Sequence, residues 1–372
     1  MSLILTINAG SSSIKFALFE TGAALRRLDQ GSFERIGLPD GPTPDAALEQ
    51  LLQWVGPRAA GGLRAVAHRI VHGGPNYSAP VLLSAAVIRE LRELSPFDPE
   101  HLPQELRLAE AMQQRFAGVP QVACFDTAFH HGLPRVAQLL ALPYRLQARG
   151  LRRYGFHGIS YAYLMIELER LAGAAAARGR VVLAHLGNGA SLAAVRDGQS
   201  VDTSMAFTPA AGIPMSTRSG DLDPGVVWYL ARTEGLDAER FNRMVNLESG
   251  LLGVSGTSPD MRDLLAREAA DSLARDAVAL FCYQVRKWIG AYAAALGGLD
   301  TLVFAGGIGE HADAVRARIC EGLEFLGVAV DSQRNAAHAR LISPDSGRVA
   351  VRVIPTDEEW MMARLVADTL GV

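Results

Sequence analysis

The sequence is poor in cysteine. The chain has 372 residues and three cysteines, Cys124, Cys282 and Cys320, which are far apart and lack CxxC spacing. This pattern excludes a disulfide-stabilised secreted scaffold and a cysteine-rich zinc site. We expect buried thiols in a reducing compartment and no disulfide.

An excess of charge and a long apolar run are also missing. The formal net charge is −3, and no dense block of Lys and Arg with interleaved aromatic residues occurs, so we expect no nucleic-acid partner. No apolar run approaches the roughly 18 to 20 residues of a membrane span, and the first residues carry no basic leader. These absences predict a cytoplasmic protein without a membrane partner.

Several common catalytic motifs do not occur. The sequence contains no GxxxxGK[ST], no HExxH and no GxSxG motif. The P-loop NTPase, zinc hydrolase and α/β-hydrolase interpretations therefore lose their main support.

The chain repeats its opening pattern. Residues 3–7 and 14–19 are short β-rich runs on either side of a turn of small polar residues, and residues 181–186 and 192–195 flank a similar turn at 187–191. At this length two domains are expected, and the repeat predicts two halves built on one plan. We place the lobes at residues 1–150 and 151–372, with the final helix packing back on the first lobe.

Helical and strand patterns alternate between the two hairpins and after them. Helices are predicted at residues 84–94, 160–172, 271–296 and 359–370, and strands at 65–71, 122–125, 301–304 and 349–354. This alternation predicts an α/β fold with mixed sheets.

Both hairpin turns are suited to bind phosphate. Turns without bulky side chains expose backbone N–H donors, and hydroxyl groups and a lysine strengthen the site. Residues 8–13 with Lys15 provide all three, and residues 187–189 provide a second such turn. A single turn of this kind is more often only a hairpin, but two in matching places strengthen the phosphate interpretation.

A third glycine turn, at residues 306–309, leaves a rival hypothesis open. Residues 307–312 fit GxGxxA, and Asp331 is predicted to end the next strand, where a ribose-binding acid would lie. An NAD-dependent oxidoreductase is therefore an alternative. It would leave both hairpins and the arginine motifs unexplained, and Glu310 would crowd a pyrophosphate.

Two arginines are candidates for binding anions. Arg69 ends an apolar strand that runs into a glycine turn, and Arg218 lies in a loop of small residues. Phosphoryl transfer to an acid needs cations, because the two reactants repel each other. The alternative for each arginine is an ion pair with a local acid, such as Asp221 for Arg218.

Other polar residues permit a structural or a catalytic interpretation. His157 lies between two glycines in YGFHG, where it could donate to a phosphoryl oxygen or simply be structural. Asp126 ends a β run and could orient a reacting group or cap the next turn. The acids at 357–359 could bind Mg²⁺ or provide negative charge at a helix N-terminus.

Taken together, these motifs resemble the acetate kinase family from the first strand to the last helix. The matching segments are residues 7–15, 68–74, 125–130, 154–158, 185–189, 202–205, 217–221 and 355–359. The resemblance implies the fold of the acetate and sugar kinase, heat-shock ATPase and actin superfamily, with two duplicated ribonuclease-H-like lobes and a homodimer. It also implies phosphoryl transfer from ATP, with Mg²⁺, to the carboxylate of a small carboxylic acid such as acetate or propionate.

The resemblance assigns a role to each motif residue. Asp126, His157 and Arg218 would be catalytic; because a carboxylate substrate has no proton to lose, we expect Asp126 to orient another group. Arg69 would bind the acid, and a small apolar pocket for its tail would be lined by Val71, Phe97, Phe156 and Pro209. Asn8 and Glu358 would serve Mg²⁺. The nucleotide would contact Ser11, Ser13, Lys15, His185, Leu186, Gly187, Asn188, Gly189, Asp260, Met261, Arg262, Gly307, Ile308, Gly309, Glu310 and His311.

The chain departs from the family pattern in several places. Residues 95–101 replace the usual Leu-His-Asn-Pro, so the expected histidine is missing unless His101 substitutes for it. Met261 stands where the family has an aromatic residue, His311 where it has Asn, and Ser216 where it has Gly. A non-catalytic ATP-binding module of the same superfamily is a further alternative.

Overall fold

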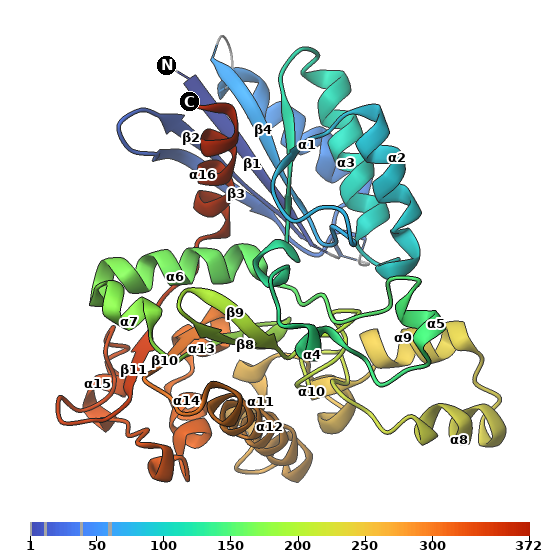
Figure 1. The fold of residues 1–372 in the computed structure, drawn as a ribbon. Coiled ribbons are helices and arrows are strands. Elements are labelled where there is room, and N and C mark those ends of the chain that lie inside the picture. The colour runs from blue at the N-terminus through green and yellow to red at the C-terminus, as the bar shows by residue number, and fades with distance from the viewer. Residues whose placement is uncertain (1, 11–12, 38–39, 59–61) are drawn as a thin grey trace. The chain divides into compact units, whose positions relative to one another are not determined.

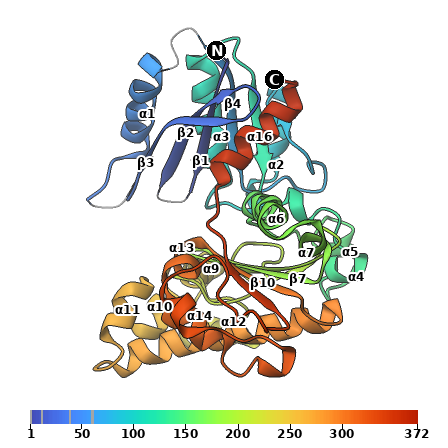
Figure 2. The same cartoon turned by 90° about the vertical axis from the view of Figure 1, so that its left-hand side faces the viewer.

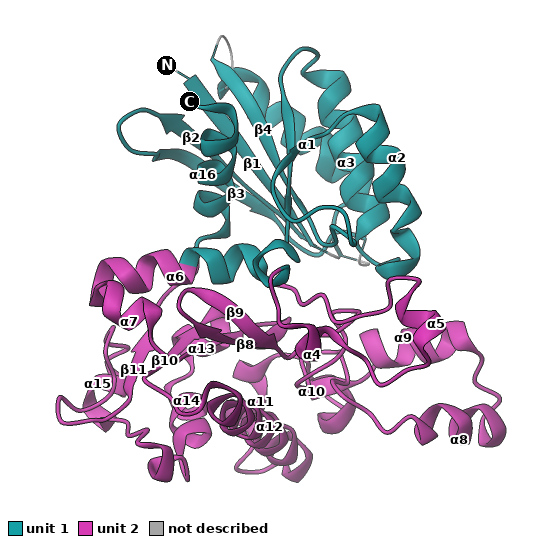
Figure 3. Ribbon diagram, viewed as in Figure 1, with its two compact units in different colours: residues 1–131, 158–163, 357–372 teal, residues 132–157, 164–356 magenta. Residues whose placement is uncertain are grey.

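The computed structural model describes residues 2–10, 13–37, 40–58 and 62–372. The chain divides into two compact units (Figure 3). Unit 1 comprises Met1–His131, Gly158–Tyr163 and Asp357–Val372, and unit 2 comprises Gly132–His157 and Leu164–Thr356. The final segment of the chain therefore belongs to the same unit as the first.

Unit 1 contains a mixed sheet in the order β3-β2-β1-β4-β6-β5. The strands β1 (Ser2–Ala9), β2 (Ile14–Thr21) and β3 (Arg26–Phe33) are antiparallel neighbours, which confirms the predicted first hairpin. The strands β4 (Leu63–Ile70) and β6 (Gln121–Phe125) continue the sheet parallel to β1, and β5 (Val81–Leu82) ends it antiparallel.

Helices cover both faces of this sheet (Figure 2). On one face Leu5 and Ile7 of β1 pack with Leu51 of α1 (Pro44–Arg58) and Met112 of α3 (Leu102–Arg115). On the other face α16 (Glu358–Leu370) packs against β1, β2 and β4. Because alternate residues of a strand point to opposite faces, Asn8 is turned toward α16. The remaining elements of unit 1 are α2 (Ala85–Glu93) and the short turns η1 (Ser95–Phe97) and η2 (Ala128–His130).

Unit 2 repeats the plan of unit 1. Its sheet has the order β11-β10-β7-β8-β9, with bounds β7 (Val181–Leu186), β8 (Ala190–Arg196), β9 (Gln199–Thr203), β10 (Thr301–Ala305) and β11 (Ala350–Val353). The first three strands are antiparallel, and β10 and β11 are parallel to β7. Strands β9-β8-β7-β10-β11 thus reproduce β3-β2-β1-β4-β6 in order and direction, which confirms the predicted duplication and the α/β class.

The long helix α12 (Ser272–Leu296) packs on the sheet of unit 2 (Figure 1). Asp271 caps it by accepting the N–H groups of Leu273 and Ala274, as the predicted start requires. The helix α6 (Gly158–Ala172) begins in unit 1 and continues in unit 2. The other helices are α4 (Arg135–Gln138), α5 (Tyr144–Gln147), α7 (Ala174–Arg178), α8 (Gly225–Thr233), α9 (Ala238–Leu247), α10 (Gly250–Ser255) and α11 (Met261–Arg267).

Two details after β10 differ from the sequence prediction. The glycine turn is itself helical: α13 (Gly306–His311) begins directly after the strand and is followed by α14 (Asp313–Cys320) and the turn η3 (Glu324–Leu326). Asp331 was expected to end a strand, but residues 321–330 contain none, and Asp331 instead caps α15 (Ser332–Ala336) by accepting the N–H of Arg334. Asp331, the acid that the dinucleotide hypothesis assigns to the ribose, thus serves as a helix cap.

The three cysteines are free and buried, as expected. Among the helices of the described residues, none combines the length and apolarity that crossing a bilayer would require.

Candidate functional site

In unit 1 Arg69 lies at the end of β4, beside the end of β6. Its Nε and Nη2 donate to Oδ2 of Asp126 at 3.1 and 2.5 Å, and its Nη1 donates to the carbonyl of Ala9 at 2.9 Å. Nη1 also lies 3.6 Å from Oε1 of Glu105. The parallel pairing of β4 and β6 brings Arg69 and Asp126 to the same edge of the sheet. Asp126 is therefore the local acid that pairs with Arg69.

The acids around Arg69 stabilise its positive charge. Burial disfavours its cation, but Asp126, Glu105 and Glu358 outweigh that effect and raise the pKa of Arg69. Asp126 is itself buried, and its second oxygen, Oδ1, makes no hydrogen bond to the described residues. A buried acceptor without a partner is uncommon in folded proteins, and a bound water molecule or ion is a usual reason for one.

At the start of α16, two carboxylates accept hydrogen bonds from the side chain of Asn8. Nδ2 of Asn8 donates to Oε2 of Glu358 at 2.7 Å and to Oε1 of Glu359 at 3.2 Å. Asp357 caps the helix by accepting the N–H of Trp360 at 2.9 Å, so the charges at 357–359 do stabilise a helix N-terminus. Burial raises the pKa of Glu358 and of Glu359, while the nearby Lys15 favours their ionised forms.

The remaining residues of the first hairpin are only partly described. Lys15 is exposed on β2, opposite Asn8 in the register of the hairpin. The carbonyl of Ser13 accepts the N–H of Gly10 at 2.7 Å and so closes the turn. Ser11 lies outside the described residues.

The oxygen atoms of this cluster are suited to Mg²⁺. Within the described ranges, no three His, Cys, Asp or Glu side chains are grouped as a metal cage. Mg²⁺ is commonly bound through one or two carboxylates together with water and phosphate oxygens, rather than by a cage of protein ligands. The amide of Asn8, the carboxylate of Glu358 and the unfilled Oδ1 of Asp126 fit that mode of binding.

Of the predicted acyl-pocket residues, two lie in each unit. In unit 1 Val71 is buried, and the half-buried ring of Phe97 packs edge-on against His72 with ring centres 5.3 Å apart. In unit 2 Phe156 and Pro209 are buried. Near Phe97, Nδ1 of His101 is 2.8 Å from Oδ1 of Asp98, and both side chains are buried.

In unit 2 His157 and Arg218 meet at the turn between β7 and β8. A Cβ atom added to Gly189 would lie 3.3 Å from Nε2 of His157 and 3.5 Å from Nη1 of Arg218. Nδ1 of His157 is 2.9 Å from the hydroxyl of Ser191, and its ring stacks on His185 with ring centres 4.3 Å apart. The structure thus brings these two predicted catalytic residues together at a glycine.

The backbone of His157 adopts an unusual conformation. His157 has φ of 59°, a left-handed conformation that is uncommon outside glycine. The next residue must be small, since a Cβ on Gly158 would lie 2.2 Å from the carbonyl of Asp126. Such local strain is often found at functional sites.

The loop that carries Arg218 is braced by Asp221. One carboxylate oxygen of Asp221 accepts the N–H of Gly212 at 2.9 Å, and the N–H of Asp221 donates back to the carbonyl of Gly212. Nη1 of Arg218 lies 3.4 Å from the carbonyl of Pro209. Asp221, the acid that could have paired with Arg218, therefore connects two parts of the loop through its hydrogen bonds to Gly212.

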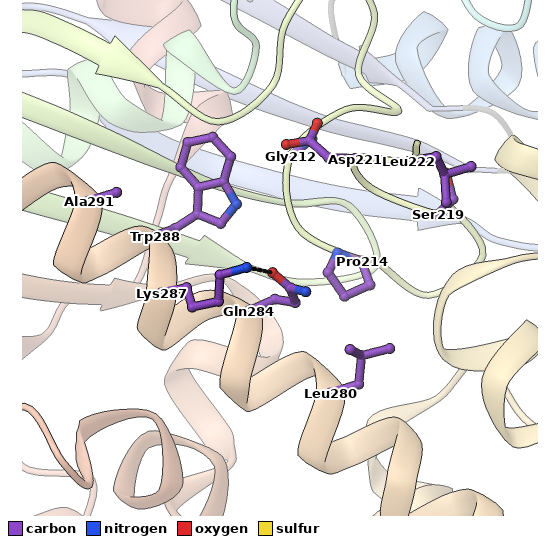
Figure 4. Close-up of a pocket in the computed structure, with 10 residues that line it drawn as sticks. All are labelled: Gly212, Pro214, Ser219, Asp221, Leu222, Leu280, Gln284, Lys287, Trp288 and Ala291. Atoms are coloured by element: carbon purple, nitrogen blue, oxygen red, sulfur yellow. Dashed lines mark hydrogen bonds between the residues drawn. The ribbon is translucent and has the colours of Figure 1, made fainter. Parts of the chain in front are cut away.

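A pocket of about 480 Å³ lies between this loop and α12 (Figure 4). Pro214, Asp221, Gln284 and Trp288 are among its lining residues. None of the residues predicted to bind substrate or nucleotide lines it.

Three turns meet at the ends of β7 and β10. The carbonyl of Asn188 accepts the N–H of Ser216 at 3.1 Å, and a Cβ on Gly306 would collide with the carbonyl of Leu186 at 2.7 Å. Oε1 of Glu310 accepts the N–H groups of Gly306 at 2.9 Å and Thr356 at 3.3 Å. Glu310 therefore occupies the donor that a dinucleotide phosphate would need.

The predicted adenosine residues lie on α11 and α13. Asp260 caps α11 by accepting the N–H of Arg262 at 2.8 Å, and its other oxygen accepts from Nη2 of Arg262 at 2.5 Å. Met261 is buried, whereas Arg262 and His311 are exposed. The side chain of Met261 thus belongs to the core of unit 2.

Sequence reasoning missed Glu105 and Ser191. One signal for Glu105 was available: α3 is amphipathic, and Glu105 falls among the buried positions Leu102, Leu106, Ala109 and Met112. An acid on the apolar face of a helix requires a partner. No comparable signal marked Ser191, because its contact with His157 joins distant segments.

Comparisons with known proteins agree on one family. The acetokinase family model matches residues 44–364. The acetate kinases of Rhodopseudomonas palustris and Carboxydothermus hydrogenoformans are 44% and 40% identical to this chain, covering 98% and 97% of it and 97% of each relative. Among solved structures, acetate kinase of Porphyromonas gingivalis (37% identity, TM-score 0.89) covers 100% of this chain and 99% of its own. A propionate kinase of Francisella tularensis (36% identity, TM-score 0.91) covers 98% and 99%.

Proposed function

Because this chain belongs to the acetokinase family, we infer that it transfers the γ-phosphoryl group of ATP to the carboxylate of acetate or propionate. The products are an acyl phosphate and ADP. The observation in the structure that best supports this activity is the partly buried guanidinium of Arg69 at a sheet edge, whose positive charge is stabilised by the acids around it. Such a group is suited to bind a small carboxylate.

We propose that Arg69 binds the acid and that Asp126 orients Arg69. The substrate is ionised at neutral pH, so no general base is needed to activate it. Asp126 engages Arg69 through one oxygen and keeps its second oxygen unfilled. That oxygen is available to orient a water molecule or another group near the substrate.

Arg218 and His157 are proposed to stabilise the phosphoryl group during transfer. In phosphoryl transfer the protein contributes mainly by positioning the reactants and by neutralising charge on the equatorial oxygens. If the Ser191 hydroxyl donates to Nδ1, neutral His157 carries its proton on Nε2, the atom that faces Gly189 and can donate to a phosphoryl oxygen.

The nucleotide is proposed to bind through both hairpins and through α11 and α13. Ser11, Ser13 and Lys15 would contact phosphate, as would the turn that follows His185. Asn8 and Glu358 would hold Mg²⁺, which when bound neutralises phosphate charge. The adenosine would contact residues 260–262 and 307–311.

The acyl tail is proposed to contact Val71, Phe97, Phe156 and Pro209. Val71, Phe156 and Pro209 are buried and Phe97 is half-buried. One methylene in an apolar pocket changes specificity by about 10- to 200-fold. Comparing kcat/KM for acids of one to four carbons will therefore identify the preferred substrate.

We also propose that the protein forms a homodimer. Support comes from α8, where Val227, Trp228 and Tyr229 are 44%, 66% and 61% exposed. Adjacent exposed apolar side chains commonly mark a protein interface. Light scattering should give twice the mass of one chain, and Trp228→Glu should lower it toward the monomer.

Trapping acyl phosphate with hydroxylamine tests the activity. ATP, Mg²⁺ and acetate or propionate should yield the acyl hydroxamate, and Arg218→Ala should reduce the rate by 10²-fold or more. Arg243→Ala is a matched control, because Arg243 forms an exposed pair with Glu248. An NAD-dependent oxidoreductase would instead bind NAD(H) and yield no hydroxamate, and a non-catalytic module would bind ATP and yield none.

A further inference from the structure

Glu105 is a buried acid directly behind the proposed substrate arginine. It lies in α3 with its side chain 2% exposed. Oε2 accepts the N–H of Val71 at 2.8 Å, and Oε1 lies 3.6 Å from Nη1 of Arg69 without a hydrogen bond to the described residues. Its carboxyl group therefore contacts both the strand end that carries Arg69 and the charge of Arg69.

Several charged groups surround this carboxyl. Arg69 faces it from β4, Asp126 from the end of β6 and Asp98 from the end of η1. Asp98 is paired with His101 at the start of α3. The neighbouring helix α2 contributes Arg92, which pairs with Glu110 on the surface of α3.

The ionisation of Glu105 changes what an anionic substrate meets. Arg69 carries one positive charge and already interacts with Asp126 and Glu358. Each further negative charge beside the guanidinium weakens its attraction for another anion. A neutral Glu105 keeps the hydrogen bond from Val71 without adding that repulsion.

We propose that Glu105 positions the end of β4 through Val71 and that its protonation sets the affinity of Arg69 for the acid substrate. The inference rests on the proposed function, since it takes Arg69 as the group that binds the acid. It adds a residue outside the motifs that carry the family resemblance.

The electrostatics of the site support this role. Burial, with smaller contributions from Asp98 and Asp126, raises the pKa of Glu105 to about 8 despite the opposing effect of Arg69. Glu105 is therefore mostly neutral at pH 7 and ionises as the pH rises through 8. The substrate is fully ionised throughout this range, so a change in its binding reports on the protein.

The test is the pH dependence of KM for the acid between pH 6 and 9.5. In the wild type this KM should rise about tenfold above pH 8, while KM for ATP changes much less. Glu105→Gln keeps an acceptor for Val71 and cannot ionise, so its KM for the acid should stay flat over the same range. Glu110→Gln, on the surface of the same helix, should behave like the wild type.

A second measurement uses only the wild-type protein. If the bound acid favours neutral Glu105, calorimetry in buffers of different ionisation enthalpy should detect proton uptake on acid binding near pH 8 and almost none near pH 6. A KM in Glu105→Gln that still rises as in the wild type, or no proton uptake at pH 8, would overturn the inference. If the wild type forms no acyl phosphate, the proposed function fails and this inference fails with it.

Discussion

At the scale of single residues, the site depends on a guanidinium held by acids rather than on a free cation. Arg69 has one fully buried partner, Asp126, and one carboxyl that approaches without a hydrogen bond, Glu105. Burying an ion pair is costly, and removing one partner leaves an uncompensated charge. The geometry therefore favours orientation of the arginine over proton transfer as the role of Asp126.

Asp126→Asn tests that role. The amide can still accept one N–H group from Arg69 but cannot offset its charge, so we expect kcat/KM for the acid to fall by at least about tenfold. The free energy of unfolding should decrease by about 3 kcal/mol, as for other broken buried pairs. Steady-state kinetics and urea unfolding measure the two effects.

The control for this variant is Asp29→Asn. Asp29 pairs with Arg58 at 2.6 Å, but both side chains are more than 40% exposed. Exposed pairs contribute about 0 to 1 kcal/mol, so stability should change little. An equal decrease in the free energy of unfolding in the two variants would contradict a larger contribution from the Arg69–Asp126 pair.

Gly189→Ala tests the meeting point of His157 and Arg218. The added methyl group would lie against both side chains, so we expect kcat to fall by about 10-fold to 10²-fold. The free energy of unfolding should change by less than about 1 kcal/mol. Gly290→Ala in α12 is the control, because its Cβ would meet no atom within 4 Å. A wild-type kcat in Gly189→Ala would argue against a reacting group at this position.

At the scale of elements, both units place polar groups after the strands of the same parallel pair. In unit 1 these groups follow β4 and β6, and in unit 2 the corresponding strands β10 and β11 are followed by the turn at Gly306 and by Thr356. Glu310 joins those two segments through one oxygen. The start of α13 is thus tied to the segment that leads into α16.

Glu310→Ala should loosen that connection. Losing two hydrogen bonds to backbone N–H groups, worth about 1 kcal/mol each, should raise KM for ATP by about tenfold and leave KM for the acid nearly unchanged. Glu310→Gln keeps an acceptor and should be close to the wild type. If both variants raise KM for the acid as well, Glu310 acts on more than the nucleotide turn.

Glu105, which is buried where α3 packs on β4, should make the free energy of unfolding depend on pH. The raised pKa of Glu105, about 8, lets the native state keep this proton up to that pH, whereas the unfolded chain loses it near the ordinary glutamate pKa of 4.5. The native state therefore binds more protons between these values, and its free energy of unfolding falls as pH rises. Glu105→Gln lacks this loss, so its stability relative to the wild type should increase from pH 5 to pH 8. A constant difference in urea unfolding over that range would exclude a raised pKa.

At the scale of the whole molecule, sequence was most informative where local patterns carry the fold. Short β-rich runs on either side of small polar turns predicted both hairpins, and their repetition predicted two halves built on one plan, which the two matching sheets confirm. The predicted helices at 84–94 and 271–296 begin at the capping residues Ser84 and Asp271, because a side chain that caps a helix acts on residues close in the sequence. The motifs likewise included Arg69, Asp126, His157 and Arg218.

Sequence was less informative where a residue's environment comes from distant segments. Glu105 approaches Arg69 from 36 positions away, and Ser191 approaches His157 from 34. The expected strand before Asp331 was wrong, because a short apolar run does not distinguish a strand from an irregular segment leading to a helix cap. The backbone strain at His157 also has no sequence signal apart from the adjacent glycines.

In the proposed reaction, an oxygen of the acid attacks the γ-phosphorus of ATP. Mass spectrometry of the product formed from ATP and acetate labelled with ¹⁸O at both carboxylate oxygens tests it most directly. We predict acetyl phosphate that retains both labels, one of them in the bridge between carbon and phosphorus, because a P–O bond forms while both C–O bonds remain intact. Acetyl phosphate that has lost one label, or ADP and inorganic phosphate without acetyl phosphate, would rule out this reaction.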